Sequence, residues 1–224
     1  MANVVIFGVG QTADIVSYYL EHDTDHEVVG YTVDRDHLNK NVHNGKPIIS
    51  FEEVDKTFPP NDYDMFVAIG YANLNRVRAE KYLAAKSKGY SLVTYIHSRA
   101  GCLDQITIGE NCFILEHQSV QAFAVVGNNC FVWSGALIAH HVVIRDHCWI
   151  TSEASIGGNS IIGERCFVGI NATIGHMVQV GNDCIVGAGT LITKSAKDGT
   201  VFITKNTEPY KLNSEQFLRI TKMS

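Results

Sequence analysis

Residues 132–174 read VWSGALIAHHVVIRDHCWITSEASIGGNSIIGERCFVGINATI, and they repeat a six-residue pattern. An Ile or Val returns at every sixth position, and the register extends beyond this stretch in both directions. The aliphatic positions are Ile108, Ile114, Val120, Val126, Val132, Ile138, Ile144, Ile150, Ile156, Ile162, Val168, Ile174, Val180, Val186 and Ile192. Units this short cannot bury their own apolar face and must stack on neighbours. The pattern predicts a left-handed parallel β-helix with three hexapeptides in each triangular coil.

Small residues and glycines occupy other fixed positions of the repeat. The fourth residue after each aliphatic position is mostly small, and Gly often follows the aliphatic residue directly. We expect the aliphatic side chain to point inward, the small one to fit the crowded corner and Gly to tolerate the turn. Five coils then run from Ile108 to about Lys197, with equivalent residues about 4.8 Å apart in successive coils.

Five of the six cysteines recur every 18 residues, once per predicted coil. They are Cys112, Cys130, Cys148, Cys166 and Cys184, and the sequence contains no CxxC pair. Buried thiols are a normal structural use of cysteine, so a stacked column is the favoured interpretation. A redox or metal role remains the alternative.

The composition excludes several classes of protein. The formal charge of −5 argues against an unaided nucleic-acid binder, which needs clustered Lys and Arg. No apolar run approaches the roughly 20 residues of a membrane span. The first ten residues lack the basic and long apolar regions of a signal peptide. We therefore expect a cytoplasmic protein.

Residues 1–100 predict a separate α/β domain, Rossmann-like in the order of its elements. Strands are expected over residues 4–7, 27–33, 46–49, 65–69 and 92–96, and helices over residues 51–54, 73–88 and a segment ending near residue 21. Strands that alternate with helices predict a small parallel sheet. Residues 101–197 form the β-helix domain, and residues 198–224 form a C-terminal tail with a short helix over 214–223.

A glycine loop follows the first predicted strand. Gly8, Gly10 and Ala13 fit the G-x-G-x-x-G/A pattern, and Asp34 ends the second strand, where a ribose-binding acid is expected. Such glycines admit a ligand close to the backbone, and the helix N-terminus favours an anion. The favoured ligand is a nucleotide-sugar. A nicotinamide dinucleotide and simple packing glycines remain alternatives, and only one mononucleotide-binding half is present.

His140 is the candidate base for chemistry on the β-helix. It is the second residue after inward-pointing Ile138, on the outward side, and His176 occupies the same column two coils away, about 10 Å distant. Gly158 lies between them in this column and leaves an open strip beside His140. A zinc site is a weaker alternative, because the His-x-x-x-x-His pair of zinc β-helices is absent: Arg145 and Gly181 stand where the second histidine is required.

The order of domains and the segment Ile138–Ile144 resemble the sialic acid O-acetyltransferase group of hexapeptide-repeat sugar acyltransferases. The nearest members of that group are N-acetyltransferases of nucleotide-linked 4-amino-4,6-dideoxy sugars, of the bacillosamine and perosamine type. The resemblance covers nearly the whole chain. It assigns the general base to His140, but His141 replaces the acidic residue that follows the base in the family. Glu116 and Glu153 are candidate substitutes for that carboxylate.

The resemblance further implies a homotrimer, with acetyl-CoA as acyl donor lying along the β-helix between subunits. The missing His-x-x-x-x-His pair leads us to expect no metal. The sequence thus nominates three groups of residues. The catalytic candidates are His140 and His141. The candidates for binding acetyl-CoA are Gly158, Ile170, Gly187, Ala188, Gly189 and Lys194, with Lys197 and Lys205 as further candidates for its phosphates. The candidates for binding the nucleotide-linked sugar are Gly8, Gly10, Gln11, Asp34, Asp36, Gly70, Tyr71 and Asn73. For the CoA glycines and lysines, coil turns and a solvated basic edge are the alternatives.

Three functions compete on this basis. N-acetylation of a UDP-, dTDP- or GDP-linked amino sugar is favoured. O-acetylation of a sugar hydroxyl is second, because a hydroxyl depends more on base assistance than an amine does. A noncatalytic scaffold or nucleotide-sugar sensor is third.

Overall fold

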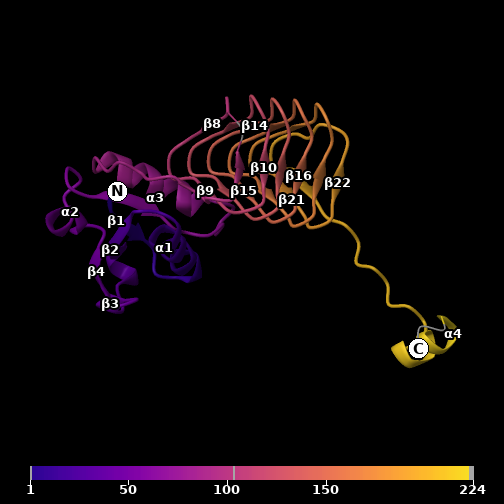
Figure 1. Ribbon diagram of the computed structural model, residues 1–224, viewed down its shortest axis with the longest axis horizontal. Coiled ribbons are helices and arrows are strands. Elements are labelled where there is room, and N and C mark those ends of the chain that lie inside the picture. Colours follow the sequence, from indigo (N-terminus) through magenta and orange to yellow (C-terminus); the bar gives the residue numbers. More distant parts are fainter. Residues whose placement is uncertain (1, 103, 222–224) are drawn as a thin grey trace.

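The computed structural model describes residues 2–102 and 104–221, which form a small N-terminal α/β domain followed by a left-handed parallel β-helix (Figure 1). The N-terminal domain contains β1 (Asn3–Phe7), α1 (Gln11–Asp23), β2 (Glu27–Val33), the 3₁₀ turn η1 (Arg35–His37), β3 (Val42–His43), β4 (Lys46–Ser50), α2 (Val54–Thr57), β5 (Asp64–Val67) and α3 (Arg76–Ser87). Its sheet has the order β3-β4-β2-β1-β5, and all neighbours are parallel except β3 and β4.

The central strand β1 is buried on both faces, as its unbroken apolar run requires. Val4 and Ile6 pack on one face with α1, and Val5 and Phe7 pack on the other with residues of α2 and α3. The β-helix completes the first of these faces, since Phe113 belongs to the same cluster as Val4 and Ile6. The N-terminal sheet is therefore covered by helices on one side and by α1 together with the β-helix on the other.

The β-helix consists of three parallel sheets, each named here by its first strand. The β6 sheet contains β6 (Tyr95–Ile96), β9 (Phe113–Ile114), β12 (Phe131–Val132), β15 (Trp149–Ile150), β18 (Phe167–Val168), β21 (Ile185–Val186) and β23 (Val201–Phe202). The β7 sheet contains β7 (Gly101–Cys102), β10 (Ser119–Val120), β13 (Leu137–Ile138), β16 (Ser155–Ile156), β19 (Thr173–Ile174) and β22 (Leu191–Ile192). The β8 sheet contains β8 (Thr107–Ile108), β11 (Val125–Val126), β14 (Val143–Ile144), β17 (Ile161–Ile162) and β20 (Gln179–Val180).

The predicted register is confirmed at the strand pairs between β8 and β22. The last pair of the β6 sheet departs from it, because Val201 of β23 pairs with Ile185, only 16 positions earlier. Val120 pairs with Ile138, and Ile138 pairs with Ile156, so equivalent residues of successive coils are 18 positions apart. The inward aliphatic residues from Ile114 to Ile192 are at most 3% exposed. The five repeated cysteines are fully buried free thiols in this core, which supports the structural interpretation.

The expected role of the repeat glycines is wrong in one respect. The left-handed corner is the third residue after the aliphatic one, where non-glycine residues such as Asn111, Asn129 and His141 have φ between 53° and 57°. The glycine directly after the aliphatic residue is needed for stacking instead. A Cβ at Gly109 would lie 2.7 Å from the main-chain nitrogen of Asn128 in the next coil.

Three other predicted elements are displaced. The strand expected over 92–96 divides between the domains: Leu92 bridges Met65 of the N-terminal sheet, whereas Tyr95 pairs with Phe113 of the β-helix. The helix expected from residue 73 begins at Arg76, because residues 73–75 are all left-handed. The helix expected over 51–54 lies at Val54–Thr57.

The tail extends away from the β-helix and ends in α4 (Ser214–Thr221), which buries none of its residues (Figure 1). Residues 222 and 223 of the predicted tail helix lie outside the described residues. Among residues 2–102 and 104–221, no helix combines the length and apolarity that crossing a bilayer requires.

Candidate functional site

A pocket of about 430 Å³ opens at the carboxyl ends of β1, β2 and β5. It brings together five of the predicted substrate-binding residues, namely Gly8, Gly10, Gln11, Asp34 and Gly70. Val9, Thr12, Val33, His37, Ile69 and Val77 complete much of the lining. Ligands of open α/β sheets bind at this edge, outside the carboxyl ends of the strands. The volume is that of a small-molecule site.

The glycine loop shapes the floor of this pocket. Gly8 has φ +123°, and a Cβ there would lie 2.8 Å from the carbonyl oxygen of Ala68 on the neighbouring strand end. A Cβ at Gly10 would meet nothing within 4 Å, so this glycine faces open space. Gly10 is the N-cap of α1 and provides no side-chain cap. The first amides of α1 are thus available to an anion, and the helix dipole favours negative charge there.

Asp34 supplies a carboxylate to the pocket, and Lys81 of α3 forms an ion pair with this carboxylate. Lys81 Nζ lies 3.0 Å from Asp34 Oδ1 and 3.1 Å from Glu80 Oε1. Burial lowers the pKa of Lys81, but the hydrogen bonds to Asp34 and Glu80 outweigh burial and raise it overall. Lys81 therefore stays charged and orients the carboxylate. No sequence motif pointed to Lys81 or to the pocket residue His37.

Three predicted substrate residues do not line the pocket. Asp36 lies in η1, and Asn73 begins the left-handed stretch before α3. The ring of Tyr71 instead packs against the β-helix, with its centroid 5.4 Å from Trp149 and 4.9 Å from Phe167. Tyr71 therefore contributes to domain packing.

His140 lies on the corner between the β7 and β8 sheets, and its ring leans across the space left by Gly158. A Cβ at Gly158 would lie 2.7 Å from His140 Cε1 and 2.8 Å from Nε2. The ring centroids of His140 and His176 are 6.5 Å apart, closer than the backbone spacing of two coils. The main-chain amide of His140 donates to Gln121 Oε1 at 3.0 Å.

The ring of His141 is the polar neighbour of the His140 ring. Their Nδ1 atoms are 3.2 Å apart, and the His141 ring packs on Phe123 with 4.8 Å between centroids. Neither candidate carboxylate takes this place. Glu116 accepts a hydrogen bond from Ser134 and lies near buried His97, whereas the carboxylate of Glu153 packs beside Gly135.

The predicted CoA-binding residues divide between two corners of the β-helix. Gly158 and Lys194 share the column of His140 on the corner between the β7 and β8 sheets. Ile170, Gly187, Ala188 and Gly189 lie on the corner between the β6 and β7 sheets. Ile170 is 49% exposed, and Gly189 is left-handed with open space around it. A Cβ at Gly187 would lie 2.9 Å from the carbonyl oxygen of Phe202, so the fold itself requires this glycine.

An aromatic column on the outer face of the β6 sheet joins the two domains. Phe113, Phe131, Trp149 and Phe167 follow one another at 18-residue intervals, and the rings of Phe131 and Trp149 stack 4.6 Å apart. Phe66 of β5 packs against Phe113 and Phe131. The regular spacing of these aromatic residues is a sequence signal that identifies the covered face.

Arg78 of α3 forms the polar part of this interface and is fully buried. Its Nη2 donates to the carbonyl oxygens of His147 at 2.9 Å and Asn129 at 3.3 Å, and its Nη1 donates to Asn75 Oδ1 at 2.8 Å. Burial lowers the pKa of Arg78 to about 10, which leaves the guanidinium charged at neutral pH. Hydrogen bonds to main-chain oxygens replace its lost hydration.

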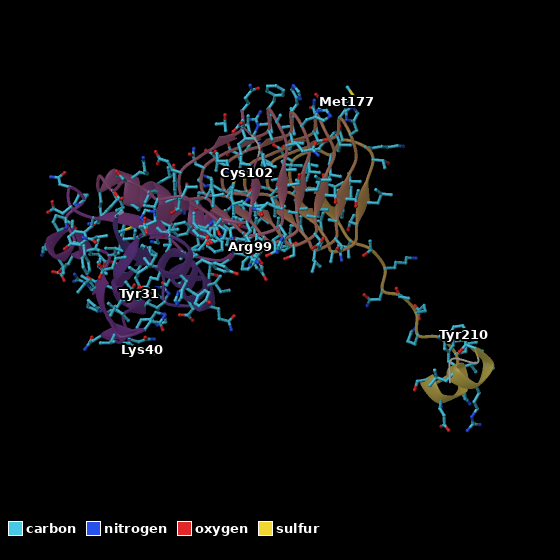
Figure 2. All side chains as sticks on the ribbon, viewed as in Figure 1. Tyr31, Lys40, Arg99, Cys102, Met177 and Tyr210 are labelled. Carbon is cyan, nitrogen blue, oxygen red and sulfur yellow. The ribbon has the colours of Figure 1, made fainter. Side chains whose placement is uncertain are left out.

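Within one chain, the pocket and His140 lie on opposite sides of the β-helix. The N-terminal domain covers the β6 sheet, whereas His140 lies on the corner formed by the other two sheets. Figure 2 shows Met177, which follows His176 on that corner, on the far side of the β-helix from Tyr31 of the N-terminal domain.

Comparison with known proteins supports the fold. The family profile described as the hexapeptide repeat of succinyl-transferase matches residues 159–194. The structure is similar to the acetyltransferase domain of PglB from Neisseria gonorrhoeae, with 24% identity, a TM-score of 0.79 and coverage of 90% of this chain and 96% of that one. No curated protein matches the chain.

The structure is also similar to perosamine N-acetyltransferase from Caulobacter crescentus. A histidine-to-asparagine variant of that protein, in complex with CoA and GDP-perosamine, has 25% identity and a TM-score of 0.80. The match covers 90% of this chain and 93% of that chain. A second structure of the same protein, PerB, holds the same two ligands and has a TM-score of 0.78.

Proposed function

We propose that this protein is an acetyl-CoA-dependent N-acetyltransferase acting on a nucleotide-linked amino sugar. The observation that carries the proposal is the pairing of two sites: a pocket at the strand ends of an α/β domain, and His140 held against Gly158 on a β-helix. The likeness to a perosamine N-acetyltransferase whose structures hold CoA and GDP-perosamine supports a protein with one site for CoA and one for a nucleotide-linked sugar. The finer grouping with sialic acid O-acetyltransferases stays a prediction.

The N-terminal pocket would hold the nucleotide. The free amides at the start of α1 suit the diphosphate, and Gly8 and Gly10 keep side chains away from it. Asp34, oriented by Lys81, would accept hydrogen bonds from ribose hydroxyls or from the base. The apolar lining from Val9, Val33 and Ile69 suits the flat face of a base.

His140 would serve as the general base. The unprotonated amine of the sugar attacks the thioester carbonyl of acetyl-CoA, so that a C–N bond forms and the C–S bond breaks. The proton leaves the nitrogen for His140 Nε2, and the imidazolium then gives this proton to the departing thiolate. A neutral amine is nucleophilic before it loses a proton, so the base has to remove the proton only after the attack. This order of steps demands less of the base, and it suits a histidine whose neighbour is His141 rather than a carboxylate.

We further propose a homotrimer in which each site is shared between chains. The separation of the pocket from His140 in one chain supports this arrangement. Acetyl-CoA would lie along the β-helix between subunits, with Gly158 and Lys194 supplied by one chain and Ile170, Ala188 and Gly189 by its neighbour. This assignment accounts for the division of these residues between two corners.

A thiol-release assay tests the activity. The protein is incubated with acetyl-CoA and a panel of UDP-, dTDP- and GDP-linked amino sugars, together with the matched hydroxyl sugars. We expect CoA release with an amino sugar and a loss of about 10²–10⁴-fold in kcat for His140→Ala. Release with hydroxyl sugars alone would favour O-acetylation. No release with any acceptor would contradict the proposal and favour a nucleotide-sugar-binding scaffold.

A further inference from the structure

The only ring-to-ring hydrogen bond at the His140 corner, among the residues that the structure describes, joins His140 and His141. Their Nδ1 atoms are 3.2 Å apart. Within residues 2–102 and 104–221, neither ring forms an ion pair with a carboxylate within 4 Å. Two neutral imidazoles joined in this way share a single proton between the two Nδ1 atoms, because one must donate and the other accept.

The position of that proton decides whether His140 is a base. If His140 donates from Nδ1, its Nε2 is unprotonated and can accept a proton from the sugar amine. If His141 donates, the neutral His140 ring carries its own proton on Nε2 and cannot accept another there. A carboxylate at position 141 can only accept, and it would therefore hold His140 in the competent form.

The surroundings position both rings for this exchange. The left-handed backbone of His141, with φ 56°, and its contact with Phe123 turn the ring towards His140. The absence of a side chain at Gly158 leaves the space that the His140 ring occupies. His176 is the other titratable group that faces His140, with 6.5 Å between ring centroids, and Gln121 binds only the main-chain amide.

We propose that His141 is a positioning residue that divides His140 between a competent and an incompetent tautomer. The two imidazoles then take up the proton of the reaction as one coupled unit. This inference rests on the proposed function, in which His140 is the base. It makes an unusual prediction: a carboxylate at position 141 increases activity, because it removes the incompetent form and stabilises the imidazolium.

The decisive variant is His141→Glu. The backbone tolerates glutamate at this corner, since Glu153 has φ 58° at the equivalent corner position of another hexapeptide. We expect kcat on the alkaline plateau, where His140 is unprotonated, to rise about two- to fivefold, and the acidic limb of the pH–rate profile to move up by about one pH unit. His141→Ala leaves Nδ1 of His140 to water and should lower kcat about tenfold.

His22→Glu is the matched control. His22 is also exposed, but it lies in α1 of the N-terminal domain, outside both corners of the β-helix that hold His140 and the proposed acetyl-CoA site. We expect its pH–rate profile to match that of the wild type. A change equal to that of His141→Glu would mean that added negative charge acts at long range, and this would overturn the inference.

A measurement without substrate separates this inference from the proposed function. Nitrogen-15 NMR of the imidazoles should show a mixture of His140 tautomers in the wild type and one tautomer, protonated at Nδ1, in His141→Glu. Identical His140 spectra in the wild type, His141→Glu and His141→Ala would overturn the inference, even if His140→Ala is inactive. An active His140→Ala variant would overturn the assignment of His140 as the base. The NMR spectra would still test whether His141 controls the tautomer of His140.

Discussion

The ring of His140 occupies the space that a side chain at Gly158 would fill, with Cε1 only 2.7 Å from the position of a Cβ. The two residues are one coil apart in the same column of the β-helix. The glycine therefore determines where the imidazole can lie. Gly158, a residue of the repeat with no chemistry of its own, thus controls the position of the candidate base.

Gly158→Ala should displace the His140 ring and reduce kcat about 10–10²-fold, because small misplacements of a catalytic group are costly. The fold should tolerate this substitution, since the backbone of Gly158 is not in the left-handed region. Gly175→Ala is the control, as a Cβ there meets no atom closer than 3.3 Å. Steady-state kinetics with an amino-sugar acceptor measures kcat for both variants. Equal activities for the two variants would contradict the role of Gly158.

Arg78→Met should destabilise the junction of the two domains by about 3–5 kcal/mol, because it leaves buried carbonyl oxygens without a donor. Arg76 is the matched control on the same helix. Its side chain is half exposed and pairs with Asp183 at 2.8 Å, so Arg76→Met should cost less than about 1 kcal/mol. Urea unfolding followed by tryptophan fluorescence reports on the junction, because Trp149 lies in it. A similar loss of unfolding free energy in both variants would contradict the role of the Arg78 hydrogen bonds at the junction.

Acid should weaken the contacts of Asp183. Hydrogen bonds from Arg165, together with the charge of Arg76, hold the pKa of Asp183 below its ordinary value, against the effect of burial. A carboxylate with a lowered pKa stabilises the folded state above its unfolded pKa of about 4, and this stabilisation is lost as the pH falls below that value. Melting temperatures of the wild type should therefore fall more steeply from pH 5 to pH 3 than those of Asp183→Asn. Parallel curves would show that Asp183 contributes nothing.

The two loop glycines should respond differently to substitution. Gly8→Ala places a Cβ 2.8 Å from a main-chain oxygen and should lower both the melting temperature and nucleotide affinity. Gly10→Val extends into open space and should lower affinity for the nucleotide about tenfold or more, with little change in melting temperature. Calorimetric titration with UDP, dTDP and GDP measures the affinities. Unchanged affinity in Gly10→Val would remove the pocket as the nucleotide site.

Mixing two inactive chains tests whether the site is shared. His140→Ala lacks the base and Gly10→Val has a weakened nucleotide pocket, so at acceptor concentrations far below KM neither alone should exceed about a tenth of the wild-type activity. If pocket and base come from neighbouring chains, co-expression of equal amounts should restore about a quarter of the wild-type activity, the fraction of sites with both parts intact. A mixture as inactive as its components would place both parts of the site in one chain.

The glycine loop was predictable from sequence because strand, turn and helix follow one another locally. Gly8, Gly10 and Asp34 all line the pocket. Lys81 was not predictable, since it reaches Asp34 from a helix 47 positions later in the chain. The contact of Tyr71 with Trp149 was not predictable either, because it joins segments 78 positions apart, and the assignment of Tyr71 and Asn73 to the substrate stays a prediction.

The amino-acid sequence by itself determined the β-helix, because stacking with a fixed period repeats the same requirement at each coil: an aliphatic residue inside and a small one at the corner. The register placed His140, Gly158 and His176 in one column without any structure. Tertiary structure decided which sheet the N-terminal domain covers, how Arg78 is buried there, and that His141 rather than a carboxylate meets His140. These contacts join segments that no local period relates, so only the packing of whole side chains could select them.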